Sequence, residues 1–543
     1  MKRILTIAAA LTAMIIIFSC AGIYYGPAVE TGGPVVRVGL LEDMESIAFE
    51  PQGDFVMAAG NGRVYRLKGG DVWQAKLVNG RPAEQVYRIM LEQSSDLEKA
   101  ETALHIAQEA NRDVELVSTG DVLTLGRRVL IDRQRHRVLL KEAFATERDA
   151  RLAIGDRPDL GNVEVIAMDD GKPTGEISLE SAKGKKIVIQ DALRISGALV
   201  GLQAVRVGEG FHWSREESRK YSGEIELLVG PTGKLYAVNV LTLSAYLEGV
   251  LPGEMMPTFP LEALKAQAVA ARTFFLYNFG RRYKDMPFDV TDDVYSQAFV
   301  GAGRSNKSIQ KAIRETQGQV LTHRGELCST PYSAVCGGHT ENAENVWAGD
   351  PIPYLSGVLD DPKSRDLPAS LDLSTDAGVR RWIKSVPKVN CNAAEYGTPD
   401  YAAYSTKYFR WQQRYTRQEL EAIILKKNNR DIGTLLDIVP LSRGVSGRII
   451  EIDIRGTADH FTVRKELNIR RALSETALNS ACFVVDKEVG ADGLPEAFVI
   501  SGAGWGHGVG MCQIGAAMMA EQGTGYRKIL THYYRGAQVD KFY

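Results

Sequence analysis

One strand-and-helix pattern occurs twice between residues 82 and 154, and it restricts how this stretch can fold. A strand-type run begins at Tyr87 and is followed by a helical pattern over 97–107. A second strand-type run begins at His136, and Thr146 then opens a capping-box pattern typical of a helix N-terminus. Further strand-type residues lie between the two copies, at 113–117 and 128–131. This order predicts a small βαββαβ unit.

A βαββαβ unit of this size resembles the SPOR domain, a module that binds peptidoglycan glycan strands stripped of their stem peptides. We expect the unit to occupy residues 82–155. A generic ferredoxin-like packing unit has the same order of elements, so the sequence leaves both interpretations open.

The remaining stretches predict a multi-domain α+β protein that is rich in strands. Its length of 543 residues, with 44% hydrophobic side chains, is enough for more than one buried core. Between residues 160 and 240, strand-type runs alternate with glycine and proline turns. We expect an N-terminal β segment at 36–81, a β-rich domain at 156–230 and a catalytic domain at 231–543.

The overall charge argues against one class of partner. The chain has 65 Lys and Arg residues against 67 Asp and Glu residues, which leaves a formal net charge of −2. Nucleic-acid binding normally requires a clustered basic surface. We therefore expect no nucleic acid among the partners.

The N-terminus has the pattern of an export signal. Lys2 and Arg3 precede an apolar run over 4–18, which is shorter than the roughly 20 residues that a membrane-spanning helix needs. The run ends at Ser19-Cys20, which resembles a bacterial lipobox with Cys20 as the lipidated residue. We expect a signal peptide at 1–20 and a flexible linker at 21–35.

The residue after Cys20 bears on the location of the protein. Ala21 at this position resembles an outer-membrane sorting signal of Gram-negative lipoproteins. We therefore expect an exported protein that a lipid anchors to the membrane, at the periplasmic face of the outer membrane. The alternative is a soluble exported protein that is cleaved nearby.

Four segments of the C-terminal half together resemble the SpoIID/LytB family of sporulation and amidase-enhancer proteins. They are Tyr246-Leu-Glu-Gly-Val-Leu-Pro-Gly-Glu-Met255, Thr291-Asp-Asp-Val-Tyr-Ser-Gln297, Cys336-Gly-Gly-His-Thr-Glu341 and Gly504-Trp-Gly-His-Gly-Val-Gly-Met-Cys-Gln513. They follow one another in the order of the family. Each segment alone is a weak signal, whereas the four together make the match specific.

The resemblance implies that Glu254 is a catalytic acid. Apolar residues flank it on both sides, and burial among them would raise the pKa of its carboxyl group. A protonated carboxyl group can donate to a glycosidic oxygen. A lytic transglycosylase needs only one such group, because the 6-hydroxyl of the sugar itself attacks. The alternative is that Glu254 is a solvated charge on a surface loop.

Further polar and aromatic residues at motif positions are candidates for binding the substrate. They are Gln267, Arg272, Asp292, Asp293, Gln297, Trp505, His507 and Gln513. For Arg272, a buried structural role is an equal alternative, because the rest of its helix is apolar. For Trp505, the alternatives are a platform for a sugar face and a buried side chain in a tight, glycine-rich corner.

The cysteines allow a metal site or a disulfide. Cys336 and His339 form a C-x-x-H pair that offers two zinc ligands, and His507 and Cys512 complete a set of four if the two segments meet. A Cys336–Cys512 disulfide or unpaired thiols are the alternatives, since an exported protein can form disulfides. The expected chemistry requires no cofactor, so zinc would have a supporting role.

Together, the resemblance implies an enzyme of cell-wall remodelling. The expected reaction cleaves peptidoglycan glycan strands, preferably denuded ones, between N-acetylmuramic acid and N-acetylglucosamine, and forms 1,6-anhydro-N-acetylmuramic acid in a groove around Glu254. The rival hypothesis is a non-catalytic peptidoglycan-binding protein that activates an N-acetylmuramoyl-L-alanine amidase. Formation of anhydro ends by the purified protein discriminates between the two.

Overall fold

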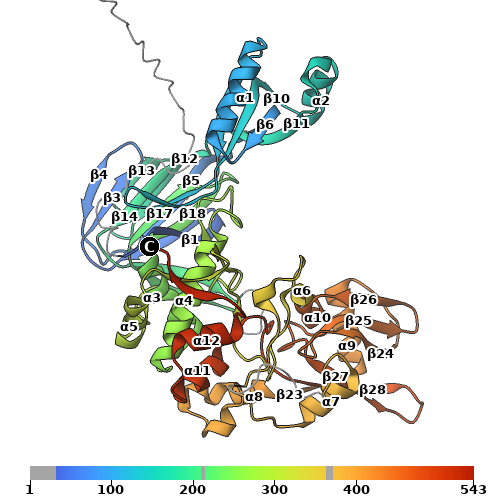
Figure 1. Cartoon of the computed structure of the whole chain (residues 1–543). Helices are drawn as coiled ribbons and strands as arrows, with labels where there is room; N and C mark the ends of the chain where they lie inside the picture. The colour runs from blue at the N-terminus through green and yellow to red at the C-terminus, as the bar shows by residue number, and fades with distance from the viewer. Residues whose placement is uncertain (1–31, 209–213, 362–370) are drawn as a thin grey trace, which may run out of the picture.

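The computed structural model describes residues 32–208, 214–361 and 371–543 (Figure 1). The predicted signal peptide, most of the linker and Cys20 lie outside these residues. Within the described ranges, no helix combines the length and the apolar character that crossing a membrane requires.

The N-terminal body consists of two sheets. The first contains, in spatial order, β19 (Val290–Thr291), β1 (Val35–Met44), β18 (Leu235–Thr242), β17 (Glu224–Val229), β14 (Ala192–Ser196), β3 (Phe55–Ala59) and β4 (Val64–Leu67). The second contains β13 (Lys186–Gln190), β12 (Thr174–Ser181), β5 (Trp73–Arg81), β2 (Ser46–Pro51), β15 (Val200–Val207) and β16 (Arg215–Tyr221). Side chains of both sheets share one hydrophobic core, which includes Phe49, Met57, Trp73 and Leu227.

This arrangement differs from the expected division into domains. Both sheets contain strands from 36–81 and from 156–230, and β18 and β19 add two strands from the predicted catalytic domain to the first sheet. The stretches therefore form one body, because neither could complete its sheets alone. The sequence pattern identified strands but not their long-range pairing.

The module predicted at 82–155 is a separate four-stranded sheet with two helices. Its elements are β6 (Glu84–Ser94), α1 (Leu97–Glu109), β7 (Val114–Thr119), β10 (Arg135–Phe144), α2 (Glu147–Gly155) and β11 (Glu164–Asp170). The strands are antiparallel in the order β11-β6-β10-β7. The module has its own core around Ile89, Val138 and Leu140, and it projects from the body in Figure 1.

Two details of this module differ from the expectation. Its last strand, β11, lies beyond residue 155, so the module extends to Asp170. The strand expected at 128–131 is β9 (Arg128–Asp132), which pairs with β8 (Val122–Leu125) in a separate hairpin. Leu123 and Ile131 of this hairpin pack into the core of the body instead. The sequence pattern gave strand propensity but not the partner of each strand.

A helical layer connects the body to the C-terminal unit. It contains α3 (Leu243–Glu254), α4 (Leu261–Asn278), α5 (Lys307–Glu315), α11 (Gln513–Glu521) and α12 (Tyr526–Tyr533). The other helices of this layer pack around α4, which is buried along most of its length. Thr242 caps α3, since its hydroxyl accepts the N–H of Ala245 at 3.3 Å.

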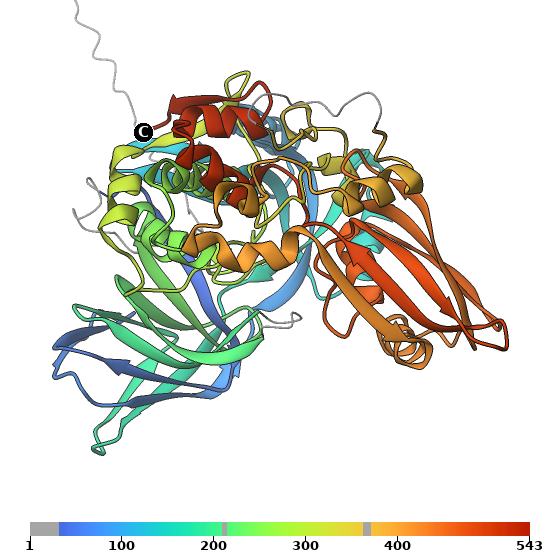
Figure 2. The same cartoon turned by 90° about the horizontal axis from the view of Figure 1, so that it is seen from below.

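The C-terminal unit has a second hydrophobic core. It contains β23 (Trp411–Thr416), α9 (Arg417–Asn428), β24 (Leu435–Arg443), β25 (Ile449–Gly456), β26 (His460–Arg464), α10 (Glu466–Ala472), β27 (Phe483–Val489) and β28 (Pro495–Gly502). Its two three-stranded sheets, β23-β28-β27 and β24-β25-β26, enclose residues such as Ile452 and Phe498. Figure 2 shows these orange and red strands to one side of the red C-terminal helices.

Candidate functional site

Glu254 is the last residue of α3, at a point where a loop approaches the helix closely. A Cβ atom at Gly253 would lie only 2.1 Å from the carbonyl oxygen of Ala298, and one at Gly249 would lie 2.3 Å from the Phe299 ring. The N–H of Val300 donates to the carbonyl of Gly249 at 3.0 Å. The two glycines, one helical turn apart, therefore allow the 298–300 backbone to lie directly against α3.

The carboxylate of Glu254 is surrounded by hydrogen-bond donors. The N–H of Ala298 donates to Oε1 at 2.9 Å, and Nε2 of Gln513 lies 3.4 Å from Oε2. Burial raises the pKa of Glu254 above its ordinary value, while hydrogen bonds from Ala298, Gln513 and Tyr332 counteract part of this rise. The result is a carboxyl group that holds its proton to higher pH than a solvated glutamate and whose anion still has donors in place.

A second layer of polar side chains orients these donors. Nε2 of Gln297 donates to the Tyr332 hydroxyl at 2.9 Å, and the Tyr246 hydroxyl donates to Oε1 of Gln297 at 3.1 Å. Tyr332 is thus left with its own proton free to donate to the glutamate. Gln513 also contacts Oε1 of Gln267 at 3.4 Å. Three predicted site residues, Gln267, Gln297 and Gln513, are therefore brought together around Glu254.

The predicted residues Asp292 and Asp293 shape the loop that carries Ala298. Nη1 of Arg219 lies 3.2 Å from Oδ2 of Asp292 and donates to the carbonyl of Phe299 at 2.7 Å. Burial raises the pKa of Asp292 to about 8, against the opposing effect of Arg219. Asp293 accepts the N–H of Tyr295 at 2.9 Å and so closes a turn. Both carboxylates are engaged within the loop and none of these contacts involves Glu254.

The structure places Arg272 away from this cluster. Its side chain is fully buried, and Nη1 donates to the carbonyl of Gln319 on β20 (Gln319–His323) at 3.1 Å. Its burial and its contact with Gln319 match the structural alternative for Arg272, and substrate contact by this side chain stays a prediction. Arg272 lies on the side of α4 that faces β20, whereas Gln267 on the same helix contacts Gln513.

Trp505 and His507 are partly buried and contact neighbouring loops, and sugar binding by either residue stays a prediction. The Trp505 ring stacks on Tyr408 with ring centroids 4.2 Å apart, and the backbone N–H of Trp505 donates to the carbonyl of Val335 at 2.7 Å. Nδ1 of His507 accepts the N–H of Val509 at 3.0 Å, so Nε2 carries the proton and donates to the carbonyl of Tyr332 at 2.9 Å. Burial lowers the pKa of His507 to about 4, which keeps the ring neutral. His507 thus fixes the backbone of Tyr332.

Residues beyond the predicted set also belong to the site. Tyr332 and the backbone of Ala298 contact Glu254, and no local pattern in the sequence distinguishes either of them. Trp347 is 43% exposed, and its ring lies 4.9 Å from that of His507. In the sequence it follows shortly after the third family-like segment, Cys336–Glu341, and this position was a signal for it. An exposed tryptophan close to the residues that support Glu254 offers an apolar face to a ligand.

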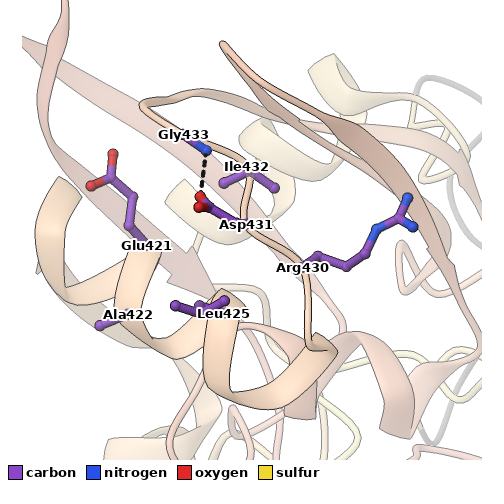
Figure 3. Close-up of a pocket in the computed structure, with 7 residues that line it drawn as sticks. All are labelled: Glu421, Ala422, Leu425, Arg430, Asp431, Ile432 and Gly433. Atoms are coloured by element: carbon purple, nitrogen blue, oxygen red, sulfur yellow. Dashed lines mark hydrogen bonds between the residues drawn. The ribbon is translucent and has the colours of Figure 1, made fainter.

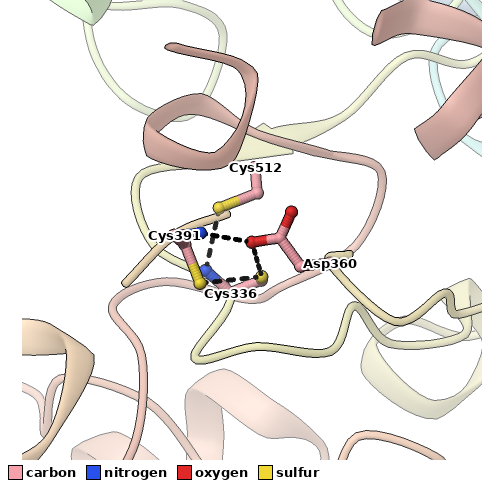
Figure 4. Close-up of side chains that lie close together, drawn as sticks. All are labelled: Cys336, Asp360, Cys391 and Cys512. Carbon is pink, nitrogen blue, oxygen red and sulfur yellow. Dashed lines mark hydrogen bonds between the residues drawn. The ribbon is translucent and has the colours of Figure 1, made fainter. Parts of the chain in front are cut away.

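The cysteine cluster differs in two members from the predicted zinc ligands. Cys336 and Cys512 are neighbours, with the N–H of Cys336 donating to Sγ of Cys512 at 3.2 Å. Their other companions are Asp360 and Cys391, and the four ligand atoms all lie within 4.8 Å of one another (Figure 4).

The two predicted histidine ligands are engaged elsewhere. Nδ1 of His339 contacts the carbonyl of Thr340 at 2.7 Å, and His507 bonds to Tyr332. No disulfide forms among the cysteines in the described part of the chain. The expectation of histidine ligands was wrong, because His339 bonds to its neighbour Thr340 and His507 bonds to the distant Tyr332 backbone, while Asp360 and Cys391 take their places in the cluster.

Two hollows in the surface involve none of the residues around Glu254. One, of about 200 Å³, lies between α9 and the loop after it, and its charged side chains already have partners (Figure 3). Arg430 pairs with Asp459 at 3.0 Å, and Oε1 of Glu421 accepts the N–H of Leu435 at 2.7 Å. The other lies along α2 in the four-stranded module. Neither hollow offers an unengaged catalytic group.

Two family models match the chain. A model described as "Stage II sporulation protein" matches residues 231–323, which include Glu254 and the Ala298 loop. A model described as "Domain of unknown function (DUF8618)" matches residues 341–510, which include the C-terminal unit. The N-terminal body and the inserted module lie largely outside both matches.

Curated relatives match 54–56% of the chain. An uncharacterized protein of Brachyspira hyodysenteriae is 31% identical over 305 residues, which are 56% of this chain and 68% of the relative. The amidase enhancer of Bacillus subtilis is 28% identical over 322 residues, covering 54% of this chain and 40% of the relative. The stage II sporulation protein D of Bacillus amyloliquefaciens is 26% identical over 320 residues, covering 56% of this chain and 76% of the relative.

Proposed function

Because the chain belongs to the SpoIID/LytB family and has a cell-wall-related function, we propose that it is a lytic transglycosylase that cleaves peptidoglycan glycan strands. The observation that carries this proposal is the environment of Glu254. Burial raises the pKa of its carboxyl group, and donors from three separate segments face it. A carboxyl group whose pKa is raised holds its proton to higher pH and is therefore better suited to act as a general acid.

The proposed reaction uses one carboxyl group twice. Protonated Glu254 donates to the glycosidic oxygen between N-acetylmuramic acid and N-acetylglucosamine, and the bond from C1 to that oxygen breaks. The 6-hydroxyl of the same muramic residue then attacks C1 and returns a proton to the Glu254 carboxylate. The products are a 1,6-anhydro-muramic end and a free 4-hydroxyl on the departing glucosamine, so no water is consumed.

The donors around Glu254 support this cycle. Ala298, Gln513 and Tyr332 stabilise the anion that exists between the two proton transfers. Hydrolytic glycosidases use a second carboxylate to activate water or to attack the sugar. Asp292 and Asp293 are bound within their loop, which favours the single-carboxylate route.

Glycan binding is assigned to two further parts of the chain. The exposed Trp347 ring would stack on a sugar face beside the site. The antiparallel βαββαβ module between β6 and β11 would act as a SPOR-like unit that holds denuded strands. Its attachment as a projecting module with its own core is compatible with capturing a long polymer at a distance from Glu254.

The proposed location follows from the N-terminal sequence alone. The basic residues, the apolar run and Cys20 favour a lipid-anchored exported protein at the periplasmic face of the outer membrane. A tether of this kind would keep the body close to the cell wall.

A second candidate function is supported by one relative, whose name is amidase enhancer. In that case the same residues would bind glycan, and the chain would stimulate a cell-wall amidase without cleaving the strand. Incubation of the purified protein with denuded glycan separates the candidates. Mass spectrometry detects 1,6-anhydro-muramic ends if the chain is a transglycosylase, and stimulation of an amidase without such ends supports the activator.

A further inference from the structure

Four side chains from separate parts of the chain converge at a buried point. Cys336 precedes the Gly337-Gly338 turn, Asp360 and Cys391 lie on two irregular loops, and Cys512 is the N-cap of α11. Cys336 is 2% exposed and the other three are fully buried. Figure 4 shows their sulfur atoms and one carboxylate oxygen directed toward one another.

The spacing of the ligand atoms matches a tetrahedral zinc site. Sγ of Cys336 lies 3.5 Å from Sγ of Cys391 and 3.4 Å from Oδ2 of Asp360. Zinc–sulfur bonds of about 2.3 Å and zinc–oxygen bonds of about 2.0 Å place tetrahedral neighbours roughly 3.5–3.8 Å apart. All four ligand atoms lie within 4.8 Å of one another, so one small ion can reach them together.

Surrounding groups orient the carboxylate as a metal ligand requires. The Tyr533 hydroxyl donates to Oδ1 of Asp360 at 2.6 Å, and Nδ2 of Asn390 lies 3.3 Å from the same oxygen. This leaves Oδ2 directed at the sulfur atoms, and the N–H of Cys391 donates to it at 2.8 Å. Hydrogen bonds that fix a ligand from outside in this way are a regular feature of metal sites.

The sulfur of Cys512 has the surroundings of a thiolate. It accepts the N–H of Cys336 at 3.2 Å and the N–H of Gly515 at 3.4 Å, at the N-terminus of α11. Backbone donors and a helix N-terminus both favour a negatively charged sulfur. Arg410 lies nearby, donating to the carbonyl of Gly337 at 3.0 Å, and it adds positive charge beside the cluster.

A disulfide accounts for this cluster less completely than a metal does. A bond between any two of the three cysteines would leave the third thiol and Asp360 buried without a charged partner, and burying a lone carboxylate is costly. A divalent cation would bind the three sulfur atoms and the Asp360 carboxylate together and offset their negative charge. The set of three sulfur ligands and one oxygen ligand, with no open position, is that of a closed structural site.

We propose that Cys336, Asp360, Cys391 and Cys512 bind one zinc ion that fixes the segments carrying Tyr332 and Gln513. Cys512 directly precedes Gln513, which contacts Glu254. Ser333 pairs with Cys512, and Tyr332 pairs with Met511, where β22 (Tyr332–Ser333) runs parallel to β29 (Met511–Cys512). The zinc therefore connects the four segments next to Tyr332 and Gln513, which donate hydrogen bonds to Glu254. An effect of the zinc on catalysis rests on the proposed function.

The test measures metal and stability in the full-length protein, purified without chelator. We expect about one zinc per chain by elemental analysis, since four ligands complete one site. Replacement by cobalt should produce the visible absorption of tetrahedral thiolate coordination. Cys391→Ser should lose the zinc and lower the melting temperature by several degrees. The matched control Cys482→Ser should keep it, because Cys482 is a buried thiol outside the cluster whose Sγ lies 3.5 Å from the carbonyl of Ser446.

Three results would overturn the proposal. They are wild-type protein without metal even after incubation with zinc, a disulfide at Cys336, Cys391 or Cys512 in non-reduced peptide maps, and equal zinc content in the Cys391 and Cys482 variants. None of these readouts depends on glycan cleavage. A protein that binds zinc but forms no anhydro ends would therefore refute the proposed reaction while supporting the metal site.

Discussion

The backbone N–H of Ala298 donates a hydrogen bond to Oε1 of Glu254 at 2.9 Å, across a contact that Gly253 makes possible. The donor is a main-chain group, so its position depends on the path of the 292–299 loop. Arg219 holds both ends of this loop through Asp292 and the carbonyl of Phe299. The carboxylate is thus positioned by backbone packing as much as by side chains.

Gly253→Ala tests this packing. The new Cβ would lie 2.1 Å from the Ala298 carbonyl, so the loop must move and the hydrogen bond to Glu254 is lost or lengthened. We expect a stability loss of about 1–3 kcal/mol from overpacking. A hydrogen bond to a charged group contributes about 1.5–3 kcal/mol, so formation of anhydro ends should fall roughly 10–100-fold.

The matched control for Gly253→Ala is Gly155→Ala. Gly155 lies at the end of α2, where a Cβ would have no neighbour within 4 Å, so stability and cleavage should change little. If Gly253→Ala melts at a lower temperature but cleaves at the normal rate, the Ala298 contact has no role in catalysis.

The pH dependence of cleavage should follow the protonation of Glu254. Because the acid must start protonated, the rate should fall as pH rises through its raised pKa. The hydrogen bond from Tyr332 stabilises the charged form and lowers this pKa. Tyr332→Phe should therefore shift the alkaline limb of the rate profile to higher pH. A profile that is unchanged in this variant, with the fold intact by circular dichroism, would contradict the assignment of the limb to Glu254.

Local patterns in the sequence identified much of the site. The motif around Glu254 predicted the glutamate that the structure surrounds with Gln267, Gln297 and Gln513. These residues lie within recognisable segments, so their types and order were informative. The chain order βαββαβ of the inserted module was equally local and is present.

Long-range contacts could not be predicted in the same way. Asp360 and Cys391 join Cys336 from loops that have no periodic pattern, so nothing in the sequence indicated that they meet. The roles of Asp292 and Arg272 depend on partners far along the chain, Arg219 and the carbonyl of Gln319. Motif membership suggested substrate contact for both, whereas burial assigns them to the architecture.

Trp347→Ala tests the proposed sugar platform. The ring is 43% exposed and its removal takes away the contact with the His507 ring, so the melting temperature should change by little. Stacking of an aromatic ring is worth about 0.5–1.5 kcal/mol, so affinity for denuded glycan should fall roughly 3–10-fold. Binding by sedimentation of glycan strands measures this, and unchanged affinity would remove Trp347 from the binding surface.

The inserted module should supply affinity for the polymer. A variant in which two short glycine-serine linkers replace residues 84–119 and 135–170 removes the sheet β11-β6-β10-β7 together with its own core, and it keeps the β8-β9 hairpin that packs into the body. It should bind amidase-treated sacculi less well than the full chain, yet still cleave short soluble glycans at a comparable rate. Equal binding of both proteins to treated sacculi would make the module a structural insertion.

Glu254→Gln gives the most direct test of the central claim. The amide keeps the volume of the side chain and much of its hydrogen bonding, but it has no proton to transfer, so glycan binding and melting temperature should stay near those of the wild type. General acid–base catalysis contributes about 10²–10⁴-fold, and one residue that performs both steps should be near the upper value. Quantifying 1,6-anhydro-muramic ends by mass spectrometry should therefore show a loss of about 10⁴-fold. Cleavage at the wild-type rate in the glutamine variant would contradict the assignment of Glu254 as the catalytic acid and base.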